Sequence, residues 1–250
     1  MSRMHDLINY CKMTIKEFGR HPGLRIPIDS LTYFSAWRKY QQEGRNSVDD
    51  QMPWMAFSAI DELNRIIRPD MRVFEYGSGG STLFWASRVK EVISIEHDRR
   101  WFEKMQQELV HRQIKNVTYL LREGENDPNY AKKDYRNPDD YISSDSNYTG
   151  QHFEAYVKTL DQYPVASFDI IVVDGRARPS CIKHAQARLK KGGYLIVDNS
   201  ERKYYLAPFS FRPEQWQVRT FGGPVPYLRH HSDTTFLLKR TDLSTQTPSR

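Results

Sequence analysis

The sequence predicts an α/β fold: a mostly parallel sheet with helices on both faces, preceded by an N-terminal helical cap. Three observations support this prediction. After residue 70, short apolar and β-branched runs alternate with amphipathic stretches long enough for helices, a pattern typical of parallel strands joined by crossover helices. Residues 169–173 are almost continuously apolar, as in a strand buried on both faces. Residues 1–70 instead carry apolar residues at helical spacing.

The first predicted element is a helix that ends at the Pro-Gly pair of residues 22 and 23, since neither residue continues a helix well. Its apolar residues recur at helical spacing and predict one buried face: Leu7, Ile8, Cys11, Ile15 and Phe18. A later helix should begin near Pro53 and stop before Pro69. We expect a helical cap over residues 1–52, a main domain over 53–243 and a flexible tail over 244–250.

The main domain contains seven predicted strands. They cover residues 72–76, 91–96, 117–121, 168–174, 193–198, 217–221 and 234–239. Helices are predicted between them at 82–89, 100–112 and 181–189. The loop between the last two strands is too short for a crossover helix, so these strands should be antiparallel.

Residues 124–152 interrupt the alternation of strands and helices. They are polar, rich in Asp, Asn, Tyr and Ser, and too long for an ordinary connection between a strand and a helix. Their tyrosines supply contact surface that a plain linker lacks. We therefore predict a lid that becomes ordered over a substrate.

The composition excludes several classes of protein. No apolar run approaches the ~20 residues that span a bilayer, and the charged N-terminus does not resemble a signal peptide. The two cysteines cannot form a disulfide scaffold, and they fit a reducing, cytoplasmic location. The net charge is +6, but no basic run exceeds two residues, so nucleic acid is the weaker expectation for a substrate.

The main candidate binding motif is a glycine-rich turn that follows the strand at 72–76. It contains Glu75, Gly77, Ser78 and Gly79, and a helix is predicted to begin at Ser81 and Thr82. Glycines allow a tight turn and let the backbone approach a ligand closely. The free N–H groups at the start of a helix favour an anionic group.

Glu96 is the expected partner of this turn, because it ends the next strand. An acidic residue at that point can accept hydrogen bonds from both hydroxyls of a ribose. Starting at Gly77, the sixth position is Thr82 rather than glycine, so the dinucleotide fingerprint is absent. The P-loop is absent as well, because no Gly-Lys-Ser/Thr follows. The two features together predict a nucleoside-containing ligand at the carboxyl edge of the sheet.

Over residues 53–240 the chain resembles the class I S-adenosylmethionine-dependent methyltransferases, which have a Rossmann-like seven-stranded sheet with an antiparallel last strand. Residues 74–81 are similar to their first motif and residues 95–98 to their second. This resemblance implies a role for each matching residue. Glu75 would interact with the methionine amino end through water or the backbone. Gly77, Ser78 and Gly79 would line S-adenosylmethionine, with Ser81 and Thr82 facing its carboxylate. Glu96 would hold the ribose, with His97 beside the adenine and Glu125 at the adenine edge.

Oxygen-bearing side chains also follow two later predicted strands: Asp174 after the fourth, and Asp198 with Asn199 after the fifth. Carboxylate and amide oxygens suit Mg²⁺, and the arrangement is similar to the metal triad of catechol-type O-methyltransferases. These three residues are therefore predicted as catalytic residues and as magnesium ligands. Arg176 and Arg178 depart from that pattern, because their charges oppose a bound cation.

Two further hypotheses concern the acceptor. His230 and His231, in the loop between the last strands, are the alternative general bases, and we place His231 among the predicted catalytic residues. Tyr204 and Tyr205, with Arg202, Lys203 and Trp216 nearby, could frame an acceptor pocket, or the aromatic residues could belong to the core.

These features predict an enzyme that transfers a methyl group from S-adenosylmethionine to an oxygen of a small molecule by direct displacement. Mg²⁺ is left open as a second cofactor, since Asp174 could instead contact cofactor or substrate directly while Asp198 and Asn199 cap a turn. We expect a small-molecule acceptor, no membrane and no nucleic acid, with a homodimer left open. The alternatives are an RNA or protein methyltransferase and a nucleoside-binding regulator without catalysis.

Overall fold

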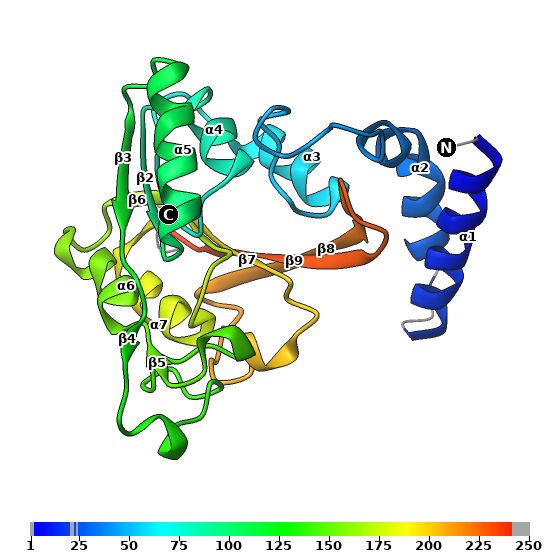
Figure 1. Ribbon diagram of the computed structural model, residues 1–250. Helices are drawn as coiled ribbons and strands as arrows, with labels where there is room; N and C mark the ends of the chain where they lie inside the picture. Colours follow the sequence, from blue (N-terminus) through cyan, green and yellow to red (C-terminus); the bar gives the residue numbers. More distant parts are fainter. Residues whose placement is uncertain (1–2, 21–22, 24, 242–250) are drawn as a thin grey trace, which may run out of the picture.

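The computed structural model describes residues 3–20, 23 and 25–241. Its centre is a seven-stranded sheet with the strand order β3-β2-β1-β6-β7-β9-β8 (Figure 1). The strands are β1 (Arg72–Tyr76), β2 (Glu91–Glu96), β3 (Val117–Leu121), β6 (Phe168–Val173), β7 (Leu189–Asp198), β8 (Trp216–Pro224) and β9 (His231–Lys239). All seven predicted strands are present, and the bounds of the first three are as predicted.

The sheet is parallel except at β9, which runs antiparallel to both β7 and β8. This confirms the predicted fold class and the antiparallel final pair. Because β6 pairs with the opposite side of β1 from β2, the strand order reverses between β1 and β6. Ligands of open α/β sheets bind at such a switch point, beyond the carboxyl ends of the strands.

Helices cover both faces of the sheet. They are α3 (Phe57–Ile66), α4 (Gly80–Ala86), α5 (Arg99–His111), α6 (Glu154–Lys158) and α7 (Arg178–Arg188). Neighbouring residues of β1 enter different apolar cores: Val73 packs in the core with α3, and Phe74 in the core with α6 and α7. This alternation is why a strand buried on both faces is apolar throughout.

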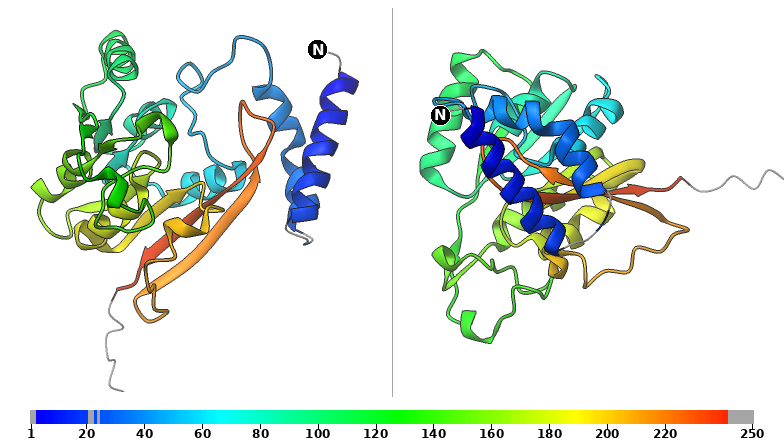
Figure 2. Two further views of the ribbon diagram at one scale, coloured as in Figure 1. Left: turned by 60° about the horizontal axis from the view of Figure 1, so that its bottom comes forward. Right: turned by 90° about the vertical axis from the view of Figure 1, so that its right-hand side faces the viewer.

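The cap consists of α1 (Arg3–Arg20) and α2 (Arg25–Tyr40), which lie side by side next to the β8–β9 hairpin (Figure 2). The indole N–H of Trp37 donates to the carbonyl of Leu228 at 2.8 Å and ties α2 to the loop of that hairpin. The hydroxyl of Tyr10 donates to the carbonyl of Ser30 at 2.7 Å and joins the two helices.

The prediction of which face of α1 is buried is wrong. Ile15 is 71% exposed, and the rest of the predicted stripe is exposed as well: Leu7, Ile8, Cys11 and Phe18. The inner face instead carries Asp6, Tyr10 and Met13. The physical reason is that the ring of Tyr10 packs against α2 while its hydroxyl bonds to a backbone carbonyl, so this polar residue can be buried.

The predicted lid, residues 124–152, forms two short antiparallel strands and two turns of 3₁₀ helix. These are β4 (Glu125–Asn126), η1 (Tyr130–Lys132), η2 (Ser146–Tyr148) and β5 (Gln151–His152). The segment lies on the side of the sheet that carries α6 and α7 (Figure 1). Two further 3₁₀ turns are η3 (Thr159–Gln162) and η4 (Lys203–Tyr205). Across the part of the chain that the structure describes, no helix is both long and apolar enough to cross a membrane.

Candidate functional site

The glycine turn brings the ends of β1 and β6 together. Gly77 has φ +92°, and a Cβ built on it would lie 2.9 Å from the carbonyl oxygen of Asp174. Gly80 is equally constrained, because a Cβ there would lie 2.0 Å from the carbonyl oxygen of Ser47. Larger residues at these two positions would push away either β6 or the segment that follows the cap.

Glu75 is fully buried at the end of β1. Its Oε2 accepts hydrogen bonds from the hydroxyls of Thr82 and Ser94, both at 2.6 Å. Burial raises the pKa of this carboxyl from 4.5 to about 7, against the opposing effect of hydroxyls of Ser81, Ser94 and Thr82. Its Oε1 accepts no hydrogen bond of good geometry within the described chain. A buried acceptor without a donor is costly, so this oxygen is the part of the carboxyl that the hydrogen bonds from Thr82 and Ser94 leave unsatisfied.

Glu96 ends β2 and is held by its own loop. Oε2 accepts from the backbone N–H of Ser78 at 3.1 Å and from its hydroxyl at 2.7 Å. Oε1 accepts from the backbone N–H groups of His97 and Asp98 at 2.8 and 2.9 Å. Burial by itself would raise the pKa of Glu96. Hydrogen bonds from His97, Asp98 and Ser78, together with the charge of His97, outweigh this effect, so the pKa of Glu96 is lowered.

Those four donors fill the about four lone-pair positions of a carboxylate. The Ser78 hydroxyl also lies 2.7 Å from the hydroxyl of Tyr119. Hydroxyl groups of a ribose would therefore replace the Ser78 hydroxyl on Glu96, and Tyr119 could keep the displaced hydroxyl bonded.

Arg176 connects the end of β6 to the end of β2 and to the lid segment. Its Nε donates to Nε2 of His97 at 2.9 Å, and its Nη1 pairs with Asp145 at 2.9 Å. The guanidinium also lies over the ring of Tyr148, at 4.8 Å from the ring centroid. The Tyr148 hydroxyl is itself 2.9 Å from the same His97 nitrogen. The lid segment is thus tied to the edge of the sheet where the adenine is predicted.

Two predicted cofactor residues lie elsewhere. Thr82 is fully buried and bonds to Glu75, so its side chain supports that carboxylate instead of facing a ligand. Glu125 is exposed in β4, paired with His152 of β5. The turn residues Ser78 and Gly79, by contrast, lie at the switch point as expected, and Ser81 is partly buried in the first turn of α4.

At the ends of β6 and β7, a buried guanidinium binds the carboxylate of Asp174 and the backbone of Asp198. Arg178 donates from Nη2 to Oδ1 of Asp174 at 3.0 Å and from Nε to the carbonyl of Gly175 at 3.0 Å. It also donates to the carbonyl of Asp198. The Asp198 carboxyl accepts the hydroxyl of Thr234 on β9 at 2.6 Å.

This arrangement does not support the predicted magnesium triad of Asp174, Asp198 and Asn199. The Arg178 guanidinium already supplies the positive charge at Asp174. Asn199, with φ +52°, points its amide to the hydroxyl of Ser232, its Nδ2 donating at 3.0 Å. The described residues also contain no cluster of three His, Cys, Asp or Glu residues that could hold a metal. The sequence signal for Arg178 was its spacing of four residues from Asp174 at the start of a helix.

The two carboxyls have raised pKa values. Burial, with the nearby charge of Asp174, raises the pKa of Asp198 well above its usual value. Burial also raises the pKa of Asp174, although Arg178 and Arg176 oppose the rise. Asp198 is almost fully buried, whereas the side chain of Asp174 is 26% exposed. Asp174 is therefore the carboxyl of the pair that a ligand can reach.

Asp174 and Asp198 line a cavity of about 250 Å³, which we call the strand-edge pocket. Its other walls include Trp54, Asn199, Arg202 and His230. His230, one of the two histidines considered as a base, therefore lies at the site.

His231 does not line the strand-edge pocket. It faces a different cavity, between the cap and the β8–β9 hairpin, together with Asp29 and Gly222. His231 begins β9 and His230 lies in the loop before it, so the two side chains line different cavities. The catalytic role of His231 stays a prediction that its position away from Asp174 does not favour. Burial lowers the pKa of His231 to about 4.

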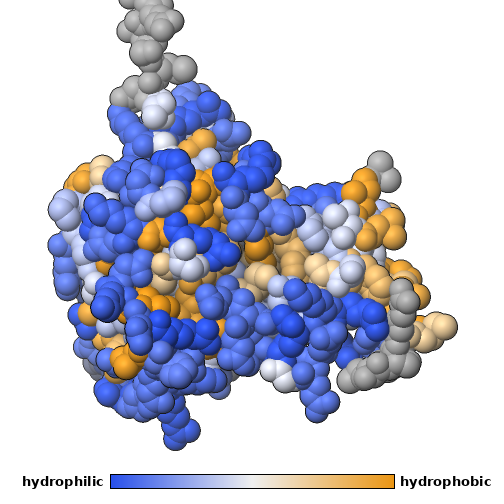
Figure 3. Space-filling model, turned by 90° about the horizontal axis from the view of Figure 1, so that it is seen from above, coloured by the Kyte–Doolittle hydropathy of each residue, from blue (hydrophilic) through white to orange (hydrophobic). Residues whose placement is uncertain are grey.

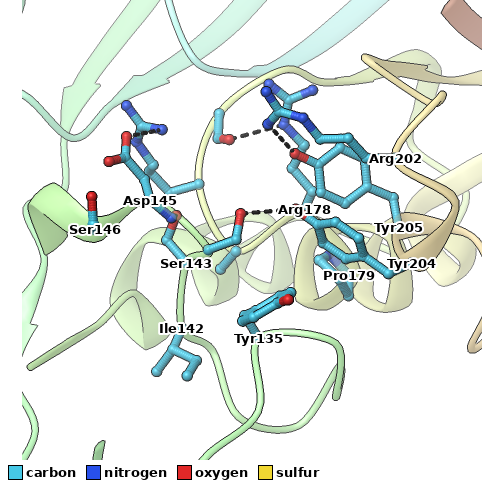
Figure 4. Close-up of a pocket in the computed structure, with 14 residues that line it drawn as sticks. Tyr135, Ile142, Ser143, Asp145, Ser146, Arg178, Pro179, Arg202, Tyr204 and Tyr205 are labelled. Carbon is cyan, nitrogen blue, oxygen red and sulfur yellow. Dashed lines mark hydrogen bonds and ion pairs between the residues drawn. The ribbon is translucent and has the colours of Figure 1, made fainter. Parts of the chain in front are cut away.

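A second cavity, of about 580 Å³, lies between the lid segment and η4. Figure 4 shows Tyr135, Arg178, Arg202, Tyr204 and Tyr205 around it. We call it the arginine–tyrosine cavity. Both alternatives hold in part: Tyr204, Tyr205 and Arg202 line this cavity, and the two tyrosines also pack in or against the apolar core. Trp216 is buried in the core and Lys203 lines neither cavity.

Comparison with protein-family models and with curated protein sequences finds no match. Among solved structures, the O-methyltransferase TomG from Streptomyces achromogenes, in complex with SAM, is similar with a TM-score of 0.53 and 18% identity over 86% of this chain and 96% of that one. The chain has the class I methyltransferase fold. An rRNA methylase from Streptococcus thermophilus also matches, with a TM-score of 0.46 and 14% identity, over 73% of this chain and 95% of that one.

Within the class I methyltransferase fold, the glycine turn and Glu96 lie at the carboxyl edge of the sheet, as predicted from the sequence. It missed Trp54 and the function of Arg178. Trp54 lies before α3 in a stretch without a motif, and only the tertiary fold brings it to the strand-edge pocket.

Proposed function

We propose that the protein is an S-adenosylmethionine-dependent methyltransferase that methylates an oxygen atom of a small molecule. The observation that carries the proposal is the contact between the two strand ends: Gly77 lies so close to Asp174 that a Cβ would not fit between them. A cofactor on the glycine turn and an acceptor at Asp174 would therefore be neighbours, as a direct displacement requires.

The residues at the switch point fit the cofactor. Glu75 offers a buried acceptor for the ammonium group, and Glu96 offers an ionised carboxylate for the ribose once the Ser78 hydroxyl moves. The glycines leave room for a ligand beside the turn. When bound, the cofactor supplies a methyl group on a positively charged sulfur.

Asp174 would act on the acceptor as a general base. The Asp174 carboxylate would take the hydroxyl proton of the acceptor, whose oxygen would receive the methyl group in exchange for the bond from that group to sulfur. The raised pKa of Asp174 makes it a better proton acceptor than an ordinary carboxylate. Arg178 fixes its orientation through the bond to Oδ1.

The size and walls of the strand-edge pocket favour a small acceptor. Its volume is about 250 Å³, and Trp54, Val225 and Leu228 supply apolar surface. An acceptor in RNA or protein, or binding without catalysis, remains as an alternative outcome of the tests.

The proposal is tested by calorimetric titration of S-adenosylhomocysteine, with NAD⁺ as the control ligand. Wild type should bind S-adenosylhomocysteine and not NAD⁺. Glu96→Gln should weaken this binding at least about tenfold, because a hydrogen bond to a charged group contributes about 1.5–3 kcal/mol. Glu91→Gln, at the other end of β2, is the matched control and should bind as wild type does. Absence of binding in wild type would contradict the proposal.

A further inference from the structure

The arginine–tyrosine cavity contains an arginine without a carboxylate partner. Arg176 pairs with Asp145 and Arg178 pairs with Asp174, so these two charges are compensated. Arg202 donates to the hydroxyl of Tyr205 at 2.9 Å and pairs with no acidic residue of the described chain. The remaining N–H groups of a guanidinium can bind a carboxylate or phosphate in a bidentate manner.

Aromatic rings form the wall beside this charge. The ring of Tyr204 lies 5.1 Å from that of Tyr135 and 4.7 Å from that of Tyr205, both edge to face. The hydroxyl of Tyr204 lies 2.8 Å from the hydroxyl of Ser144, so the lid segment and η4 meet across the cavity. The volume of the arginine–tyrosine cavity, about 580 Å³, is within the range of small-molecule sites. Planar rings pack well against such a wall.

Arg202 also lines the strand-edge pocket, so one guanidinium borders both cavities. A ligand whose anionic group binds Arg202 could extend into the arginine–tyrosine cavity and place a hydroxyl near Asp174. The carboxylates at the strand edge would repel the anionic group of such a ligand, which favours the orientation with that group on Arg202.

We propose that the methyl acceptor is an anionic molecule with a planar ring, whose carboxylate or phosphate binds Arg202 and whose ring lies against Tyr204 and Tyr135. This inference rests on the methyltransferase function proposed above for its reaction. The binding of the anion depends only on the cavity.

The test is calorimetric titration of benzoate, phenyl phosphate and uncharged benzamide into wild type, Arg202→Gln and Lys203→Gln. Lys203→Gln removes the same charge from the neighbouring residue, which lines neither cavity. Wild type and Lys203→Gln should bind benzoate or phenyl phosphate at least tenfold more tightly than benzamide. Arg202→Gln should lose that preference. Whichever of benzoate and phenyl phosphate binds more tightly shows whether the acceptor carries a carboxylate or a phosphate.

The proposal is overturned if benzamide binds wild type as tightly as both anions do, if neither anion binds, or if Arg202→Gln keeps the preference. S-adenosylhomocysteine is titrated in parallel into the same three proteins. Intact anion binding without S-adenosylhomocysteine binding would overturn the methyltransferase function and keep the anion site. The reverse result would overturn the anionic acceptor alone.

Discussion

The two halves of the sheet edge hold their carboxylates in different ways. At the ends of β1 and β2, hydroxyl and backbone N–H groups bind Glu75 and Glu96, and these donors lie in β2, in the loops after β1 and β2, or in the first turn of α4. At the ends of β6 and β7, the partners are the guanidinium of Arg178 and the hydroxyl of Thr234. The first half is assembled locally and the second by distant segments.

Under the proposed function, the half at β1 and β2 would bind the cofactor and the half at β6 and β7 would take the proton from the acceptor. Neutral donors leave Glu75 with a free oxygen and hold Glu96 ionised, which suits a ligand with an ammonium group and hydroxyls. A fixed guanidinium beside a partly exposed carboxyl orients Asp174, which suits proton transfer. Substitutions in each half should therefore change different measurements.

The largest expected effect is that of Asp174→Asn on turnover. Removing a general base lowers kcat about 10²–10⁴-fold, because the amide cannot take the acceptor proton. Binding of S-adenosylhomocysteine should stay within threefold of wild type. The measurement is kcat on an acceptor found by screening, beside the calorimetric affinity. If Asp174→Asn kept the wild-type kcat, Asp174 would not be the general base, and the division of roles between the two halves would be contradicted.

Arg178→Met should destabilise the fold strongly. It leaves Asp174 and Asp198 buried without a counter-charge, which costs about 3–5 kcal/mol. Urea unfolding measures this loss. The loss should be larger at pH 8 than at pH 5, because protonation at low pH relieves the uncompensated charge. Arg65→Met is the control: its partner is Glu62, but its side chain is 73% exposed, so its loss should stay near 1 kcal/mol or below.

Glu75 should make the stability of the protein depend on pH in the opposite sense to an ordinary paired carboxylate. Burial raises its folded pKa to about 7 from 4.5, so the folded state holds a proton that the unfolded state releases. Its contribution is complete below about pH 4.5 and is lost as the pH rises to about 7, by up to about 3 kcal/mol.

Urea unfolding of wild type and Glu75→Gln at pH 5 and pH 8 checks this dependence. The difference in unfolding free energy between the two proteins should shift in favour of the variant at the higher pH. A difference that does not change with pH would show that Glu75 stays ionised in the folded protein.

The smallest expected effect is that of metal removal. Because Arg178 supplies the positive charge at Asp174, EDTA should leave kcat within about twofold and added Mg²⁺ should not raise it. If EDTA abolished the activity and Mg²⁺ restored it, the prediction that Arg178 supplies the positive charge at Asp174 would be contradicted.

Much of the fold was predictable from the sequence, because strands appear in it as short apolar runs, which can be recognised without knowledge of the tertiary structure. The bounds of β1, β2 and β3 follow from such runs, and β6 was recognisable as a strand buried on both faces. The face of α1 was not predictable, since an apolar stripe does not say whether it packs within the chain. Tyr10 instead became the buried residue through its bond to Ser30.

The site divides in the same way. Glycine at position 77 and the acid at the end of β2 depend on local backbone geometry, so the sequence by itself determined the glycine turn, the acidic residue beside it and the strands that carry them. Only the tertiary structure decided that Arg178 pairs with Asp174, that His230 rather than His231 lines the strand-edge pocket, and that Arg202 lines two cavities. The physical reason is that each of these facts depends on where a side chain points after distant segments have packed together.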